Sequence, residues 1–142
     1  MSIWFVQPTR DDFTQQARST MIEHLAIEFV EVGDDYLTAR MPVDARTVQP
    51  YGLLHGGASV ALAETLGSMA AACCVDAVKK MVVGLDINAN HVRGVRSGFV
   101  TGTARPLHLG SSTQVWDIRI VDERDKLVCI ARLTMAVLDR AA

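Results

Sequence analysis

Apolar positions recur along the chain with two different periods, which divides it into helical and extended segments. Near the start, apolar residues recur every four positions after a capping Thr9, and this spacing predicts a short amphipathic helix. Other stretches are rich in β-branched and aromatic residues and predict strands. The residues at helical spacing are Phe13, Ala17, Met21 and Leu25, and the predicted strands span 25–32, 36–43, 81–92, 99–105, 113–122 and 127–138.

Residues 56–74 have a different texture, because Gly, Ala, Ser and Leu dominate and β-branched residues are sparse. They predict a helix about 28 Å long with small or apolar residues on every side, which indicates a helix enclosed by protein. Gly33-Asp34-Asp35 predicts a hairpin turn between the first two strands. A helix, a hairpin, a buried helix and then four strands predict a single α+β domain over residues 1–142, with an antiparallel sheet covering the long helix.

The overall composition excludes several classes of protein. A chain of 142 residues with 49% hydrophobic residues can form a core without disulfides, and its net charge of −2 argues against binding to nucleic acid. Its three cysteines include an adjacent pair and form no CxxC motif, which fits a reducing compartment. The sequence has neither a secretory leader pattern nor an apolar run of membrane-spanning length. We therefore expect a cytoplasmic protein that does not bind membranes.

One carboxylate stands out from its surroundings. Across the 29 positions from Thr47 to Val75, Glu64 is the only formally charged residue. It lies in the middle of the predicted long helix, where an unpaired buried carboxylate is rarely tolerated for stability alone. Glu64 is therefore a candidate nucleophile or general base, with a simple surface position on the helix as the alternative.

The start of the same helix carries a second candidate feature, the sequence His55-Gly56-Gly57. Backbone N–H groups at a helix N-terminus have no partners within the helix, and the helix dipole is positive there. Glycines permit close approach of a carbonyl, and His55 could donate a further hydrogen bond to a developing oxyanion. A tight loop capped by His55 is the alternative.

The distance between the two features has a consequence for assembly. Glu64 follows Gly56 by eight residues, which is about 12 Å along a helix axis, whereas a reacting group must come within about 3.5 Å of its target. Two antiparallel copies of the helix could pair the His-Gly-Gly of one chain with Glu64 of the other, which predicts a homodimer with two composite sites. Ser68, four residues after Glu64, could orient the carboxylate or a water, or could simply pack between helices.

Other catalytic signatures are missing from the sequence. There is no GxSxG, P-loop, GxGxxG or HExxH motif, and the four histidines show no close ligand spacing. We expect no metal and no redox cofactor.

Three blocks of sequence, 49–68, 83–93 and 106–111, form recognisable motifs. The first resembles the hotdog-fold acyl-CoA thioesterase family, and the match extends over nearly the whole chain. The other two also resemble the branch that contains the 1,4-dihydroxy-2-naphthoyl-CoA hydrolases of menaquinone synthesis and the proofreading thioesterases of enterobactin synthesis. The resemblance implies a curved antiparallel sheet wrapped around a long central helix. It also implies dimers, commonly paired into dimer-of-dimers tetramers, with substrate at the subunit interface.

The resemblance also implies roles for individual residues. Glu64 would be the nucleophile or general base, Gly56 N–H and His55 would polarise the thioester carbonyl, and Gln49 and Ser68 would help place substrate and water. A second set would line the path of the CoA pantetheine and nucleotide: Val83, Gly84, Asn90, His91, Val92, Arg93, His108, Leu109, Gly110, Ser111 and Ser112.

These features favour an enzyme that hydrolyses an aromatic acyl-CoA thioester to free acid and CoA, 1,4-dihydroxy-2-naphthoyl-CoA being one candidate. A proofreading thioesterase acting on carrier-protein thioesters is an alternative, with an acyl-carrier protein as partner. A non-catalytic acyl-CoA or acyl-carrier binding module on the same fold is another, because fold alone does not define activity. Hydratase chemistry is disfavoured, since the helix offers Glu64 and no His-Asp pair.

Overall fold

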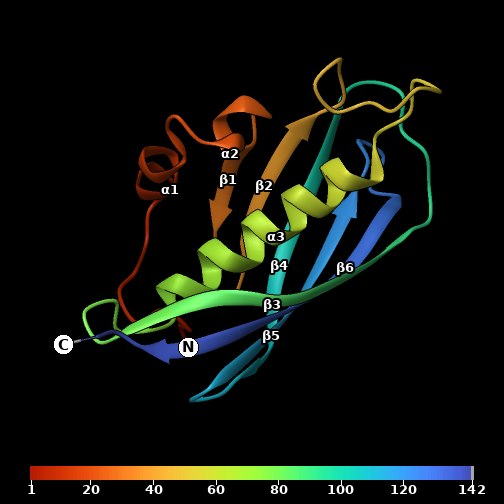
Figure 1. The fold of residues 1–142 in the computed structure, drawn as a ribbon. Helices are drawn as coiled ribbons and strands as arrows, with labels where there is room; N and C mark the ends of the chain where they lie inside the picture. Colours follow the sequence, from red (N-terminus) through yellow and green to blue (C-terminus); the bar gives the residue numbers. More distant parts are fainter. Residues whose placement is uncertain (142) are drawn as a thin grey trace.

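The computed structural model describes residues 1–141, in which a six-stranded antiparallel sheet carries a long helix across one face (Figure 1). The sheet order is β1-β2-β4-β5-β6-β3, which makes β1 and β3 its two edges. This arrangement confirms the predicted α+β class. The helices are α1 (Arg10–Ala17), α2 (Met21–His24) and α3 (Gly56–Cys73), and the strands are β1 (Glu28–Val32), β2 (Leu37–Pro42), β3 (Lys80–His91), β4 (Phe99–Leu109), β5 (Thr113–Val121) and β6 (Leu127–Asp139).

Helix α3 forms where the sequence predicts it and packs on the sheet through one face. Two glycines allow a close approach: a Cβ at Gly67 would lie 2.5 Å from Leu133 Cδ2, and one at Gly102 would lie 2.7 Å from Leu66 Cδ1. The buried residues of α3 are Ser59, Leu62, Ala63, Leu66, Gly67, Ala70 and Ala71. The partly exposed ones include Ala58, Val60, Ala61 and Met69.

The prediction that α3 is enclosed on every side is therefore wrong for the single chain. One side packs on the sheet, while the small and apolar residues of the other side stay accessible. Burial of this apolar surface against another protein surface would stabilise the molecule further through the hydrophobic effect. Among residues 1–141, no helix is both long enough and apolar enough to cross a membrane.

The first helix is broken where the four-residue spacing predicts continuity. Helix α1 has the Thr9 capping box and buries Phe13 and Ala17, as expected, but it ends at Ala17. The chain turns through Ser19 at φ 60°, and Thr20 then caps the separate short helix α2. Met21 is consequently 61% exposed. Hydroxyl and carboxylate groups that bond to free backbone N–H groups favour such a break over a continuous helix.

The strands otherwise follow the prediction, with changes at their ends. The β1–β2 hairpin turns at residues 33–35, but Leu25 caps α2 instead of starting the strand. Strand β4 continues to Leu109, four residues past the predicted end at Arg105. It accommodates Pro106, which has no N–H, through a register shift against β5 between Pro106 and His108.

Candidate active site

The N-terminal end of α3 is held by hydrogen bonds to the preceding loop. His55 is the N-cap, and its Nδ1 accepts a hydrogen bond from the Gly57 N–H at 2.7 Å. The His55 N–H donates to the Thr47 carbonyl at 2.8 Å. A neutral imidazole that accepts at Nδ1 carries its proton on Nε2, so this ring remains a donor. His55 is thus both the cap and a candidate oxyanion donor.

The loop that leads into α3 is itself anchored by an ion pair. The Arg46 guanidinium contacts the Asp44 carboxylate at 2.5 Å and lowers the pKa of that carboxyl to about 2. Thr47 is buried and donates its hydroxyl to the Pro42 carbonyl at 2.8 Å. These contacts fix the loop from which Gln49 and His55 project.

A cavity of about 430 Å³ lies beside the first turn of α3 and brings together five of the predicted site residues, Gln49, Gly56, His91, Val92 and Arg93. Gly56 faces it, and among residues 1–141 its N–H has no hydrogen-bond partner. The His91 ring lies against Gly56, where a Cβ would come 2.9 Å from Nε2. Gln49 Oε1 accepts from the Tyr51 N–H, which leaves its amide N–H₂ free to donate. The lining residues are Gln49, Leu53, Leu54, Gly56, Ser59, His91, Val92, Arg93, Gly94 and Val128.

The Glu64 carboxylate lies elsewhere, against the middle of β3. A Cβ built on Gly84 would lie 2.5 Å from Glu64 Oε2. Glu64 is only half-buried and has no hydrogen bond or ion pair with any residue between 1 and 141. It does not line the cavity that contains Gly56. Within one chain the carboxylate and the oxyanion donors are therefore separate, as the spacing on the helix predicts.

Ser68 does not bond to Glu64, although the two are one helical turn apart. Its hydroxyl lies 3.8 Å from the sulfur of Met135 on β6 and donates to it. In the single chain the Ser68 hydroxyl thus contacts the sheet, and its role in placing the carboxylate or a water stays a prediction. Met135 is 1% exposed and was missed by sequence reasoning, because a methionine in an apolar strand looks like any other core residue.

The residues predicted to bind CoA fall into two groups at opposite ends of the sheet. His91 pairs with Cys129 on β6, whereas Val83 pairs with Ala136, which also pairs with Thr113. Cys129 and Ala136 are seven residues apart, or about 23 Å along the strand. One group is Asn90, His91, Val92 and Arg93, and the other is Val83, Gly84, His108, Leu109, Gly110, Ser111 and Ser112. The β4–β5 hairpin of the second group projects at the lower end of the sheet in Figure 1.

Neither the cysteines nor a metal site provides an alternative catalytic centre in the described part of the chain. Burial raises the pKa of Cys73 to about 11 and of Cys74 to about 12, so neither thiol is a ready nucleophile at neutral pH. No group of three or more His, Cys, Asp or Glu side chains in the described part of the chain is arranged to hold a metal ion.

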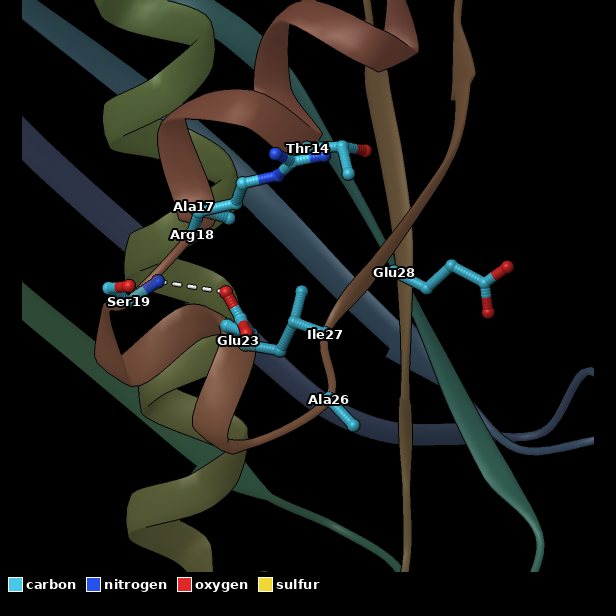
Figure 2. Close-up of a pocket in the computed structure, with 8 residues that line it drawn as sticks. All are labelled: Thr14, Ala17, Arg18, Ser19, Glu23, Ala26, Ile27 and Glu28. Carbon is cyan, nitrogen blue, oxygen red and sulfur yellow. Dashed lines mark hydrogen bonds between the residues drawn. The ribbon is translucent and has the colours of Figure 1, made fainter.

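A pocket of about 390 Å³ between α1, α2 and the start of β1 contains none of the predicted residues (Figure 2). Its two carboxylates are already engaged. Glu23 accepts from the Ser19 N–H at 2.8 Å, and Glu28 pairs with Arg40 at 2.9 Å. We assign no chemistry to it.

Comparison with known proteins agrees with the fold. Residues 51–129 match the model of the thioesterase superfamily. The chain is 53% identical to the 1,4-dihydroxy-2-naphthoyl-CoA hydrolase of Escherichia coli over 96% of this chain and 99% of that protein. It is 49% identical to the proofreading thioesterase EntH of Cronobacter turicensis over 96% and 98%. The crystal structure of a mutant of thioesterase PA1618 from Pseudomonas aeruginosa superposes with a TM-score of 0.96 at 52% identity, covering 98% of this chain and 100% of that one.

The chain belongs to the thioesterase superfamily and has the hotdog fold. It is a thioester hydrolase, which favours the enzyme over the non-catalytic binding module.

Proposed function

We propose that the chain hydrolyses an aromatic acyl-CoA thioester at a site shared by two subunits, with Glu64 as nucleophile or general base. The observation that carries this proposal is the separation of two half-sites on one helix. Donors are present at the start of the helix, where Gly56 faces one cavity and His55 lines the neighbouring one, and the lone carboxylate of Glu64 lies against β3. Neither half can act alone on one carbonyl.

Dimerisation through β3 would join the halves. β3 is a 12-residue edge strand with an unpaired side, and α3 beside it has an accessible apolar surface. A two-fold axis near the middle of β3 would bring Glu64 and the β4–β5 hairpin of one chain toward Gly56, His91 and the cavity of the other. By resemblance to the family, such dimers would pair further into a tetramer.

The chemistry follows from these positions. The Gly56 N–H and His55 Nε2–H would donate to the thioester oxygen as negative charge develops on it, and Gln49 would hold the acyl group or water. As a general base, Glu64 takes a proton from water while the water oxygen bonds to the carbonyl carbon; the C–S bond then breaks and the thiolate receives the proton. As a nucleophile, a Glu64 oxygen instead bonds to the carbonyl carbon and the C–S bond breaks, which releases the CoA thiolate and leaves an anhydride; water then hydrolyses the anhydride to the free acid and restores the Glu64 carboxylate. Both routes need the same placement of the carboxylate.

The aromatic acyl group is supported by the name of the Escherichia coli relative, 1,4-dihydroxy-2-naphthoyl-CoA hydrolase. If that compound is also the substrate here, the chain serves menaquinone biosynthesis. The proofreading thioesterase relatives, at 49% identity, keep carrier-protein thioesters as the alternative. The cavity beside Gly56 is lined by Leu53, Leu54 and Val128, which suits an apolar group.

A substrate panel tests the proposal. The panel contains 1,4-dihydroxy-2-naphthoyl-CoA, benzoyl-CoA, decanoyl-CoA and an aryl carrier-protein thioester, and a thiol-reactive dye follows release of the thiol. We expect the highest kcat/KM with an aromatic CoA ester, and a loss of at least about 10³-fold in kcat for Glu64→Gln with substrate affinity retained. Preference for decanoyl-CoA would contradict the aromatic assignment, and near wild-type turnover by Glu64→Gln would remove Glu64 from the chemistry.

A further inference from the structure

We propose that Gly84 is a positioning residue for the reaction: its missing side chain provides the space in which the Glu64 carboxylate is held, with Met135 beneath it. This inference rests on the proposed role of Glu64. It gives Gly84 a function other than contact with the pantetheine arm of CoA, which is what the family resemblance implies for it.

The backbone of Gly84 does not itself require glycine. The residues with positive φ in the described chain are Ser19, Ala26, Gly52, Gly98 and Asp125, and Gly84 is not among them. An interior strand position without a side chain costs stability relative to one with a side chain. The reason for glycine here must therefore come from what occupies the space of the absent Cβ.

That space is occupied by one atom of one side chain. A Cβ on Gly84 would lie 2.5 Å from Glu64 Oε2, whereas the next nearest atoms, Glu64 Cδ and Met135 Sδ, lie at 3.8 and 3.9 Å. The conflict is thus confined to the carboxylate oxygen. Because this oxygen is at the end of a flexible side chain, an added methyl group would displace the carboxylate and leave the strand and the core in place.

No other contact fixes the carboxylate. The Glu64 carboxylate forms no hydrogen bond or ion pair within residues 1–141, so its contact with Gly84 is what limits its direction on the side of β3. Met135 closes the space from β6, and Ser68 Oγ donates to Met135 Sδ at 3.8 Å. Glu64 and Met135 therefore both border the space of the absent Gly84 side chain, and Ser68 contacts the methionine.

Strand β3 also contains a bulge directly after Gly84. The pairing of β3 with β6 shifts register between Gly84 and Asp86, which leaves Leu85 as an extra residue, 61% exposed. A bulge bends its strand locally and changes the direction in which neighbouring positions face. It directly follows the glycine that receives the carboxylate.

The substitution Gly84→Ala tests the role. A displacement of about 1 Å of a reacting group costs about 10²-fold in rate, so we expect kcat to fall about 10- to 100-fold with KM within about threefold of wild type. The melting temperature and the oligomeric state should be unchanged. If Gly84 instead serves contact with pantetheine, KM rises and kcat is retained, which would overturn the inference.

A double-mutant cycle with Glu64→Asp distinguishes a specific effect of Gly84→Ala on the carboxylate from a general effect on β3. Aspartate is one methylene shorter than glutamate, so the carboxylate of Glu64→Asp would not reach the space above Gly84. Glu64→Asp lowers kcat by itself, and adding Gly84→Ala to it should lower kcat by less than about twofold. An equal loss in both backgrounds would show a general effect on β3 and overturn the proposal.

The outcomes separate this inference from the proposed function. If the wild type hydrolyses thioesters, Glu64→Gln is inactive and Gly84→Ala keeps wild-type kcat, then the positioning role alone is wrong. If Glu64→Gln remains active, the proposed role of Glu64 is wrong, whatever Gly84→Ala does.

Discussion

The two places where α3 meets β3 are built in opposite ways. At the first turn of the helix, a side chain of the strand, His91, lies on a glycine of the helix, Gly56. In the middle of the helix, a side chain of the helix, Glu64, lies on a glycine of the strand, Gly84. The first place presents hydrogen-bond donors and the second a carboxylate.

The two places are also held differently. The first turn is fixed by directional hydrogen bonds, including Gly57 N–H to His55 Nδ1 and His55 N–H to the Thr47 carbonyl. The Glu64 carboxylate forms no hydrogen bond or ion pair within residues 1–141 and lies against Gly84. Stabilisation of an oxyanion requires donors at fixed distances, whereas a carboxylate that moves a proton needs an unpaired oxygen. The two halves stay apart in one chain because eight residues, or about 12 Å, separate Gly56 from Glu64 along the helix.

Mixed dimers test whether the two halves belong to different subunits, and they give the largest expected effect. Glu64→Gln and His55→Ala chains should each be nearly inactive alone. After mixing and subunit exchange, half of the dimers would be mixed, and each mixed dimer would have one intact site, so activity should recover to roughly a quarter of wild type. Thiol release before and after exchange measures this. Failure to recover, with mixed dimers demonstrated by a tag on one chain, would contradict the shared site.

Substitutions at His55 separate its two roles and give the next largest effect. His55→Ala removes both the cap and the donor, and should lower kcat about 10²- to 10³-fold and stability by about 1 kcal/mol. His55→Ser keeps a capping oxygen but cannot reach the oxyanion, so it should restore stability and leave kcat low. Chemical denaturation and initial rates measure the two effects. Recovery of kcat in His55→Ser would show that capping alone matters.

Ser68→Ala gives the smallest expected effect. Because the Ser68 hydroxyl donates to Met135 Sδ and not to Glu64, its loss should lower kcat by no more than about fivefold. A loss close to that of Glu64→Gln would mean that the hydroxyl acts on the reacting groups directly in the assembled enzyme. Ser59→Ala, at a buried serine of the same helix, controls for removal of a helical hydroxyl.

The sequence was sufficient for the fold class and for the identity of the main candidates. The helix from Gly56, the hairpin around residues 33–35 and the four later strands occur where their periodicity predicts them. Local sequence patterns predicted the wrong helix boundary where side chains accept hydrogen bonds from backbone N–H groups. The spacing of Phe13, Ala17 and Met21 is typical of one helix, but Thr20 and Glu23 bond to backbone N–H groups and divide it.

By itself, the sequence determined that a single carboxylate stands in a long uncharged segment and that a His-Gly-Gly turn precedes it by about two turns of helix. Only the tertiary structure decided what these groups touch. Gly84 lies between Glu64 and Met135 because β3 and β6 pair in one register, and a slip of β3 by one residue would place a different position opposite Met135 and under the carboxylate. Periodicity records which face of an element is buried, whereas contacts between residues distant in the chain depend on register and bulges.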